Sequence, residues 1–212
     1  EKKSLDGNVV KIIGFNHDVL SEPDTAYGTS SVTGKAGISF EYIKPVIDEE
    51  IRIDGREQGN WSNSELRREL NETTYNSLSI KNSIKKVKKE YIPTYDTAPT
   101  TMPTTDDYIW LLSCGEIWDN GYNNGITRGY EIATEGKQYK YYKTNLGSTI
   151  YSSPNNITKK TSVNNSSWWW LRSPPGTSFS MSSYSFCAVR DVGSTGYPFA
   201  SSSEKVAPGF SF

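Results

Sequence analysis

Short apolar stretches recur along the chain between long polar segments, and their spacing predicts the elements. Strands are predicted where β-branched and aromatic residues alternate with polar ones or run together; the early ones are residues 9–13, 38–43 and 107–112. Helix starts are predicted by two Ser-x-x-Glu capping boxes, which are Ser62 with Glu65 and Ser113 with Glu116. Ile80, Ile84 and Val87 have helical spacing, but residues 84–92 could equally form a strand.

The most concentrated apolar stretch is Trp168-Trp169-Trp170-Leu171, which Arg172 follows directly. Side chains of successive strand residues point to opposite faces, so three adjacent tryptophans predict a strand buried on both faces or nearly so. Arg172 then needs carboxylates or carbonyls for its five N–H groups, and we expect it to hold the structure together. We therefore interpret Trp168, Trp169, Trp170 and Arg172 as a structural frame.

Further strands are predicted at residues 186–190 and 206–212, beyond Pro174-Pro175. The helical signals come earlier in the chain, and the last strands follow one another at short distance. This order favours an α+β fold whose final strands form a small antiparallel set.

The composition limits the class of protein. The chain of 212 residues is long enough for one domain, residues 1–212, and its hydrophobic fraction of 34% with 13% aromatic residues indicates a core built from large rings. A net charge of −1 gives no electrostatic indication of nucleic-acid binding, and no apolar run approaches the length needed to span a bilayer. We interpret Lys85, Lys86, Lys88 and Lys89 as a solvated face. Cys114 and Cys187 exclude a disulfide-rich scaffold but leave one bridge open.

The segment from residue 176 onward is rich in Ser and Gly with interspersed Tyr and Phe. Antibody paratopes have this composition, because tyrosine offers a large rigid contact while serine and glycine adapt to the partner. The alternative is a solvated loop that binds nothing. Within residues 186–191, one alternating set should pack inward, and we expect Ala188, Arg190 and Asp191 to be exposed.

Several of these stretches occur together, in the same order, in one group of proteins. The chain resembles bacterial and bacteriophage domains marked by a Trp-Trp-Leu-Arg-Ser-Pro signature, here residues 169–174. The other matching pieces are residues 13–18, 35–40, 61–67, 84–89, 111–113, 116–117, 135–139, 186–189 and 206–210.

The resemblance implies a C-type-lectin-like fold with two helices and a small antiparallel sheet. It also implies a variable protein of a diversity-generating retroelement, in which a reverse transcriptase randomises adenines in a C-terminal repeat. Asn-type codons changed in this way never encode Lys, Glu, Gln, Met or Trp. Between residues 176 and 203 only Met181 falls outside the permitted set, and residues 176–205 are the variable ligand-binding region that the resemblance implies.

We assign the expected ligand-binding surface to residues of this region. They are Thr177, Phe179, Met181, Ser183, Tyr184, Ala188, Arg190, Asp191, Thr195, Tyr197, Pro198, Phe199, Ser202 and Glu204.

Chemistry on a substrate has little support in the sequence. His17 is the only histidine and has no nucleophile motif beside it, so we expect a structural histidine and no enzyme. Two strings imitate lectin calcium motifs, residues 22–24 and 118–120, but they lie far apart, and we expect neither a metal nor a cofactor. An oxidase-like enzyme that uses Cys114 or Cys187 is the weakest alternative.

The sequence thus predicts a ligand-binding display protein with a hypervariable C-terminal surface. A non-diversified bacterial surface or carbohydrate-binding module is the main alternative. We expect a protein or glycan partner on a cell surface, no nucleic acid, no membrane insertion, and a place on a phage virion or a bacterial surface. The oligomeric state stays open.

Overall fold

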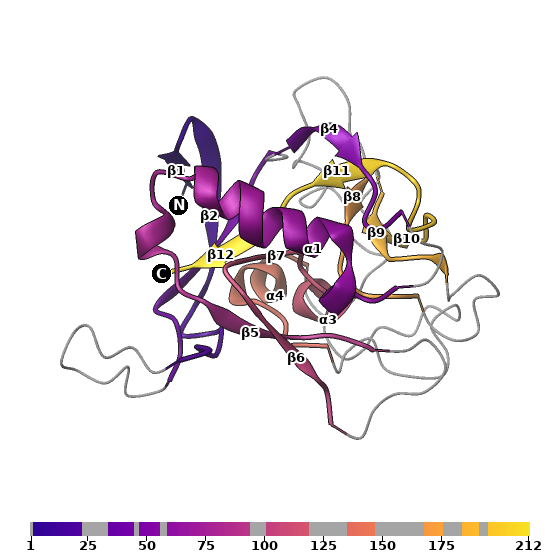
Figure 1. Ribbon diagram of the computed structural model, residues 1–212. Helices are drawn as coiled ribbons and strands as arrows, with labels where there is room; N and C mark the ends of the chain where they lie inside the picture. Colours follow the sequence, from indigo (N-terminus) through magenta and orange to yellow (C-terminus); the bar gives the residue numbers. More distant parts are fainter. Residues whose placement is uncertain are drawn as a thin grey trace.

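The computed structural model describes residues 2–22, 34–44, 47–55, 59–93, 101–118, 135–146, 168–175, 184–190 and 195–212. In these residues the protein is α+β, with few short helices and several small, mostly antiparallel sheets (Figure 1). The prediction of an α+β fold is confirmed.

The first sheet has the order β1-β2-β3-β12-β7, and its neighbouring strands are all antiparallel. It therefore combines strands from both ends of the chain, because the C-terminal β12 lies between β3 and β7. The strands are β1 (Lys2–Leu5), β2 (Asn8–Phe15), β3 (Ile38–Tyr42), β7 (Ile109–Trp110) and β12 (Gly209–Ser211).

The second sheet has the order β10-β9-β8-β11-β4 and contains the tryptophan run. Its pairs are antiparallel except for β8 and β11, which run parallel. The strands are β4 (Ile47–Ile51), β8 (Trp169–Trp170), β9 (Ala188–Val189), β10 (Thr195–Gly196) and β11 (Glu204–Val206). A third, two-stranded sheet pairs β5 (Val87–Glu90) with β6 (Thr104–Asp107).

Helical segments connect and cover these sheets. One nearly continuous stretch runs across the front of the molecule in Figure 1 and comprises η1 (Trp61–Asn63), α1 (Glu65–Glu69), the π-helical turn η2 (Leu70–Thr74) and α2 (Tyr75–Ser77). The remaining helical segments are η3 (Lys81–Ser83), α3 (Cys114–Trp118) and α4 (Lys140–Leu146). None of the helices in the described part of the chain has the length and apolarity that crossing a membrane requires.

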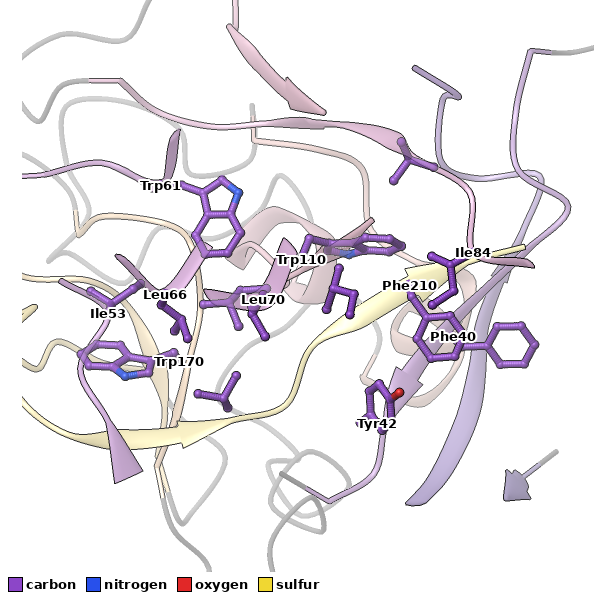
Figure 2. Packing of buried hydrophobic residues seen from close by; sticks show 14 of the residues in the cluster. Phe40, Tyr42, Ile53, Trp61, Leu66, Leu70, Ile84, Trp110, Trp170 and Phe210 are labelled. Carbon is purple, nitrogen blue, oxygen red and sulfur yellow. The ribbon is translucent and has the colours of Figure 1, made fainter. Parts of the chain in front are cut away.

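Buried apolar side chains form two clusters. The first lies between the helical stretch and the two large sheets, and it includes Trp61, Leu66, Leu70, Trp110 and Trp170 (Figure 2). The second lies around α3 and α4 and contains twelve buried residues. Aromatic rings contribute to both clusters, as the aromatic composition indicates.

The hydrophobic pattern predicted only part of the elements, and it gave no signal for β1, β4, β6, β10 and α4. The strands at residues 9–13 and 38–43 and the burial of Leu66 and Leu70 are confirmed. The first helix does not start with a Ser62–Glu65 box: Ser64 caps α1 by accepting a hydrogen bond from the Arg67 N–H. For residues 84–92 the strand alternative holds, since β5 lies there.

Gly209 gives a test of the packing at the centre of the first sheet. A Cβ atom there would lie 3.0 Å from the Phe40 carbonyl oxygen and 3.0 Å from the Trp110 ring. We expect Gly209→Ala to lower the free energy of unfolding by about 1–3 kcal/mol, as overpacked cores do. In Gly37→Ala the nearest atom lies 3.6 Å away, at ordinary contact distance, so its change should stay within about 0.5 kcal/mol. Urea unfolding of both variants measures the difference, and equal losses would contradict the packing argument.

Candidate functional site

The tryptophan run forms the wall between the two hydrophobic clusters. Trp170 is fully buried in the first cluster, and Trp169, its neighbour in β8, is fully buried in the second. The alternation of side chains thus places adjacent rings in different cores, and the prediction of a strand buried on both faces is confirmed for these two residues. β8 is held on one side by β9 and on the other by β11.

Trp168, the first of the three, lies at the edge of this wall and is only partly buried. The Arg190 guanidinium lies over its ring, 5.1 Å from the centroid. Gly196 faces the same ring, so closely that a Cβ atom there would lie 2.5 Å from Trp168 Cζ3. A cation–π contact and a close backbone approach therefore join three segments of the C-terminal region at one ring.

Arg172 fixes the end of the run from inside the protein. Its side chain is fully buried and donates hydrogen bonds to the carbonyl oxygens of Glu90 (2.9 Å) and Leu111 (2.6 Å). The same guanidinium binds the Glu116 carboxylate, with Nη1 2.7 Å from Oε2. A planar guanidinium suits this role, because its donors point in fixed and divergent directions. Arg172 thus ties β8 to β5, to the segment after β7 and to α3.

Glu116 is shared between two buried cations. Besides Arg172 it contacts Lys89, with Nζ 2.5 Å from Oε1, and Lys89 Nζ lies 2.8 Å from Asp18 Oδ1. The Tyr139 hydroxyl donates to Asp18 (2.7 Å) and lies 2.9 Å from Lys89 Nζ. Burial raises the pKa values of the two carboxyls, but Lys89 and Arg172 outweigh it, so the pKa values of Asp18 and Glu116 lie below their ordinary values.

Glu135 is the fifth member of this buried ion cluster, which comprises Asp18, Lys89, Glu116, Glu135 and Arg172. Its carboxylate accepts a hydrogen bond from the Ser173 hydroxyl and lies 3.9 Å from Arg172 Nε. Three carboxylates thus face two cations, and one negative charge is in excess when all are ionised. Burial raises the pKa of Glu135 to about 7, with the Glu116 charge adding to the rise, so that protonation makes the cluster neutral.

The expected surface residues that the structure describes lie on β9, β10 and β11 of the second sheet or in the segments beside these strands. The backbone joins residues 184–186 to residues 198–200: the Phe186 N–H donates to the Pro198 carbonyl (3.2 Å) and the Ala200 N–H to the Tyr184 carbonyl (2.7 Å). Phe199 is 45% exposed and Arg190 is exposed. Those that are partly buried are Tyr184, Thr195, Tyr197, Pro198, Ser202 and Glu204.

Other expected surface residues lie outside the described part of the chain. They are Thr177, Phe179, Met181, Ser183 and Asp191.

Two expectations about exposure are wrong. Ala188 is fully buried, because it pairs with Trp170 on one side and with Gly196 on the other in the middle of the sheet. Lys89 is not part of a solvated face, because its ammonium group turns inward to Asp18 and Glu116. In the same run Lys88 is exposed, and Lys85 and Lys86 are partly buried.

The remaining candidates for chemistry also have defined positions. His17 stacks on Tyr139, with ring centroids 3.9 Å apart, and burial lowers its pKa although Asp18 opposes the shift. The two calcium-like strings run into residues 23–24 and 119–120, which lie outside the described residues. Within the described part, His, Cys, Asp and Glu side chains form no group of three or more that could hold a metal ion.

The buried ion cluster was not predicted from the sequence as a unit. Its members come from five separate segments, and the sequence gave a local signal for two of them: the need of Arg172 for acceptors, and the Ser113–Glu116 capping box. That box is confirmed: the Glu116 N–H donates to Ser113 Oγ (3.0 Å) and the Ser113 N–H to Glu116 Oε2 (3.0 Å).

The fold and the site define an α+β protein with a buried ionic centre, next to which a tryptophan strand supports a C-terminal surface. The chain belongs to the DUF6273 family, a domain of unknown function, whose family model matches residues 33–211. The match includes the tryptophan run and the whole of the expected surface. No curated protein and no solved structure matches the chain.

Arg172→Ala tests the structural role of the buried guanidinium. Its removal leaves Glu116 with one cation fewer and leaves two backbone carbonyls without a donor. Breaking a buried ion pair from one side costs about 3–5 kcal/mol, so we expect the variant to be largely unfolded or to melt more than about 6 °C lower. Circular dichroism melts measure this, with the exposed Arg68→Ala as control. A variant that melts like the wild type would contradict the role.

Glu135→Gln tests the raised pKa. The folded protein holds the Glu135 proton more tightly than the unfolded chain, so this group stabilises the fold below about pH 4.5, and the contribution is lost as the pH rises to about 7. Glutamine imitates the protonated acid. We therefore expect the variant to match the wild type at pH 4 and to be more stable at pH 8, by up to about 3 kcal/mol.

The measurement is urea unfolding at several pH values for both proteins. His17 titrates in the same range with the opposite sign, since its lowered pKa makes stability rise with pH, but it is present in both and cancels in the difference. Exposed Glu72→Gln serves as the control. Parallel pH profiles of wild type and Glu135→Gln would exclude the raised pKa.

Proposed function

We propose that this protein displays a variable ligand-binding surface, built from residues 176–205, on a C-type-lectin-like scaffold. The observation that carries the proposal is a contrast in burial between two sets of side chains. Trp169, Trp170, Leu171 and Arg172 of the frame are fully buried, whereas Tyr184, Arg190, Tyr197 and Phe199 of the C-terminal region are partly buried or exposed. Side chains of such a surface can be substituted without changing contacts in the core. The mechanism is recognition without a chemical step.

The described surface has the features of a recognition site. Phe199 and Tyr184 offer aromatic area on adjacent segments, and Arg190 adds a charge whose position the Trp168 ring restricts. Aromatic and arginine side chains supply most of the binding energy at interfaces. Close by, a polar hollow of about 480 Å³ lies between α1 and Ser203, with Arg52, Arg68 and Glu69 in its lining. A ligand that covers the surface would reach this hollow at the end of the variable region.

The C-type-lectin-like scaffold is supported by the arrangement of the chain. The C-terminal β12 lies between β3 and β7, and the helical segments lie on the sheets. In this arrangement the variable region lies in sequence between two fixed elements, β8 before it and β12 after it. A bacterial cell-surface or phage location and a protein or glycan partner follow from this proposal.

Two matched libraries test whether the surface is exchangeable. One randomises Tyr184, Arg190, Phe199 and Ser202, and the other randomises Trp169, Trp170, Leu171 and Arg172. Exposed positions change stability by about 0.5 kcal/mol or less, whereas truncation of a buried tryptophan costs about 3–5 kcal/mol. We expect most members of the first library and few of the second to resist protease at 25 °C. Similar survival in both libraries would contradict the distinction between an exchangeable surface and a fixed frame.

The coding DNA tests diversification itself. We expect a near-identical copy of the segment for residues 176–203 near the gene, together with a reverse transcriptase gene, and differences between the copies at adenines. Codons for Trp168 to Trp170 contain no adenine and should be identical in both. If the neighbourhood holds no such copy, the protein is instead a non-diversified surface or carbohydrate-binding module.

A further inference from the structure

Cys114 and Cys187 lie far apart in sequence but meet in the second hydrophobic cluster. Both thiols are free and fully buried. Cys114 is the first residue of α3, and Cys187 immediately precedes β9. The mechanism of surface display described above uses neither of them.

Ser173 brings the two cysteines together. Its hydroxyl oxygen accepts a hydrogen bond from the Cys114 N–H (2.8 Å), and its carbonyl oxygen accepts one from the Cys187 N–H (2.7 Å). The Cys187 thiol lies 3.4 Å from the Pro174 carbonyl oxygen, and the Cys114 side chain interacts with it. Two buried cysteines of one cluster, whose backbone N–H groups both donate to Ser173, are placed for a covalent bond between them.

We propose that Cys114 and Cys187 form a disulfide bond that fastens α3 to the strand β9 behind the C-terminal surface. This inference is independent of the proposed function, since it concerns two residues of the core. The reaction needs a disulfide of low molecular weight, such as glutathione disulfide, as oxidant. One cysteine thiolate attacks that disulfide and releases one glutathione. The second cysteine thiolate then attacks the protein sulfur of the mixed disulfide and releases the other.

Burial determines when the bond forms. It raises the pKa of the Cys187 thiol well above its usual range, with the interaction with Cys114 adding to the rise, so Cys187 is almost never a reactive thiolate in the folded protein. Full burial also keeps both sulfur atoms away from an oxidant in solution. Oxidation should therefore occur while the chain folds, or through opening of the cluster. Once formed, the bond is protected from reductants by the same burial.

The bond should stabilise the fold strongly, because it closes a long loop. Residues 114–187 include the tryptophan run, and loops of this length give bridges among the more stabilising ones. We expect the oxidised protein to melt about 5–15 °C higher than the reduced one.

The experiment starts from reduced, unfolded protein that is refolded in a mixture of reduced and oxidised glutathione. The expected result is a monomer with no free thiol when assayed in denaturant, and a peptide pair in which Cys114 is joined to Cys187. Reductant should reach the disulfide only after denaturant or heat has opened the fold. It should then restore two free thiols and lower the melting temperature. Two free thiols after refolding, a mixed disulfide with glutathione, or disulfide-linked dimers would each overturn the proposal.

A kinetic comparison tests the role of burial. Folded, reduced protein should lose its thiols to oxidised glutathione at least tenfold more slowly than the same protein in urea. The Cys114→Ala/Cys187→Ala double variant is the control, and its melting temperature should not respond to reductant. If this variant does not fold, the thiol count and the peptide map of the wild type still decide whether the disulfide forms. Equal oxidation rates with and without urea would contradict the inference that the disulfide forms before the two cysteines are buried.

Discussion

The ion pair between Arg172 and Glu116 lies where the separate parts of this protein meet, and most of the described structure depends on it. Arg172 follows β8, and Glu116 belongs to α3; Lys89 on β5 and Asp18 after β2 continue the chain of charges. Taking such charges out of water costs several kcal/mol for each ion, and only mutual pairing offsets that cost. The ions therefore specify one arrangement of these elements more than they add stability, because another register would leave a charge unpaired.

Alternation along β8 explains how one strand serves two cores. Trp169 packs around α3, and Trp170 packs against the helical stretch and the first sheet. If one of the two rings is removed, the other cannot fill its space, because side chains of adjacent strand residues point to opposite faces. The strand is short, but its position is fixed by the rings, by two neighbouring strands and by Arg172 at its end. The C-terminal surface beside this strand is therefore supported by a part of the protein that tolerates little change.

The sequence predicted those features that depend on interactions between residues close together in the chain. The alternation of Trp169 and Trp170 and the box of Ser113 with Glu116 depend on neighbouring residues only, and both are present. Lys89 shows where this reasoning ends: within its basic run nothing distinguishes it from Lys88, and its partners Asp18 and Glu116 lie in other segments. Ala188 shows the same limit in a strand, since the pattern of residues 186–191 did not reveal that strands pack on both of its sides. Pairing between distant segments was the missing information.

The C-terminal surface is exchangeable only in part, and the fixed positions within it follow from packing. Gly196 has no room for a side chain beside Trp168, and Ala188 has no exposed area, although both lie within the proposed variable region. Arg190 and Phe199, by contrast, extend away from the core from nearby positions. On the proposed function, a diversified surface on this sheet would be a mosaic, in which small buried residues keep the strands in register while their exposed neighbours change. This interleaving, and not the length of the segment, would then limit the number of different surfaces.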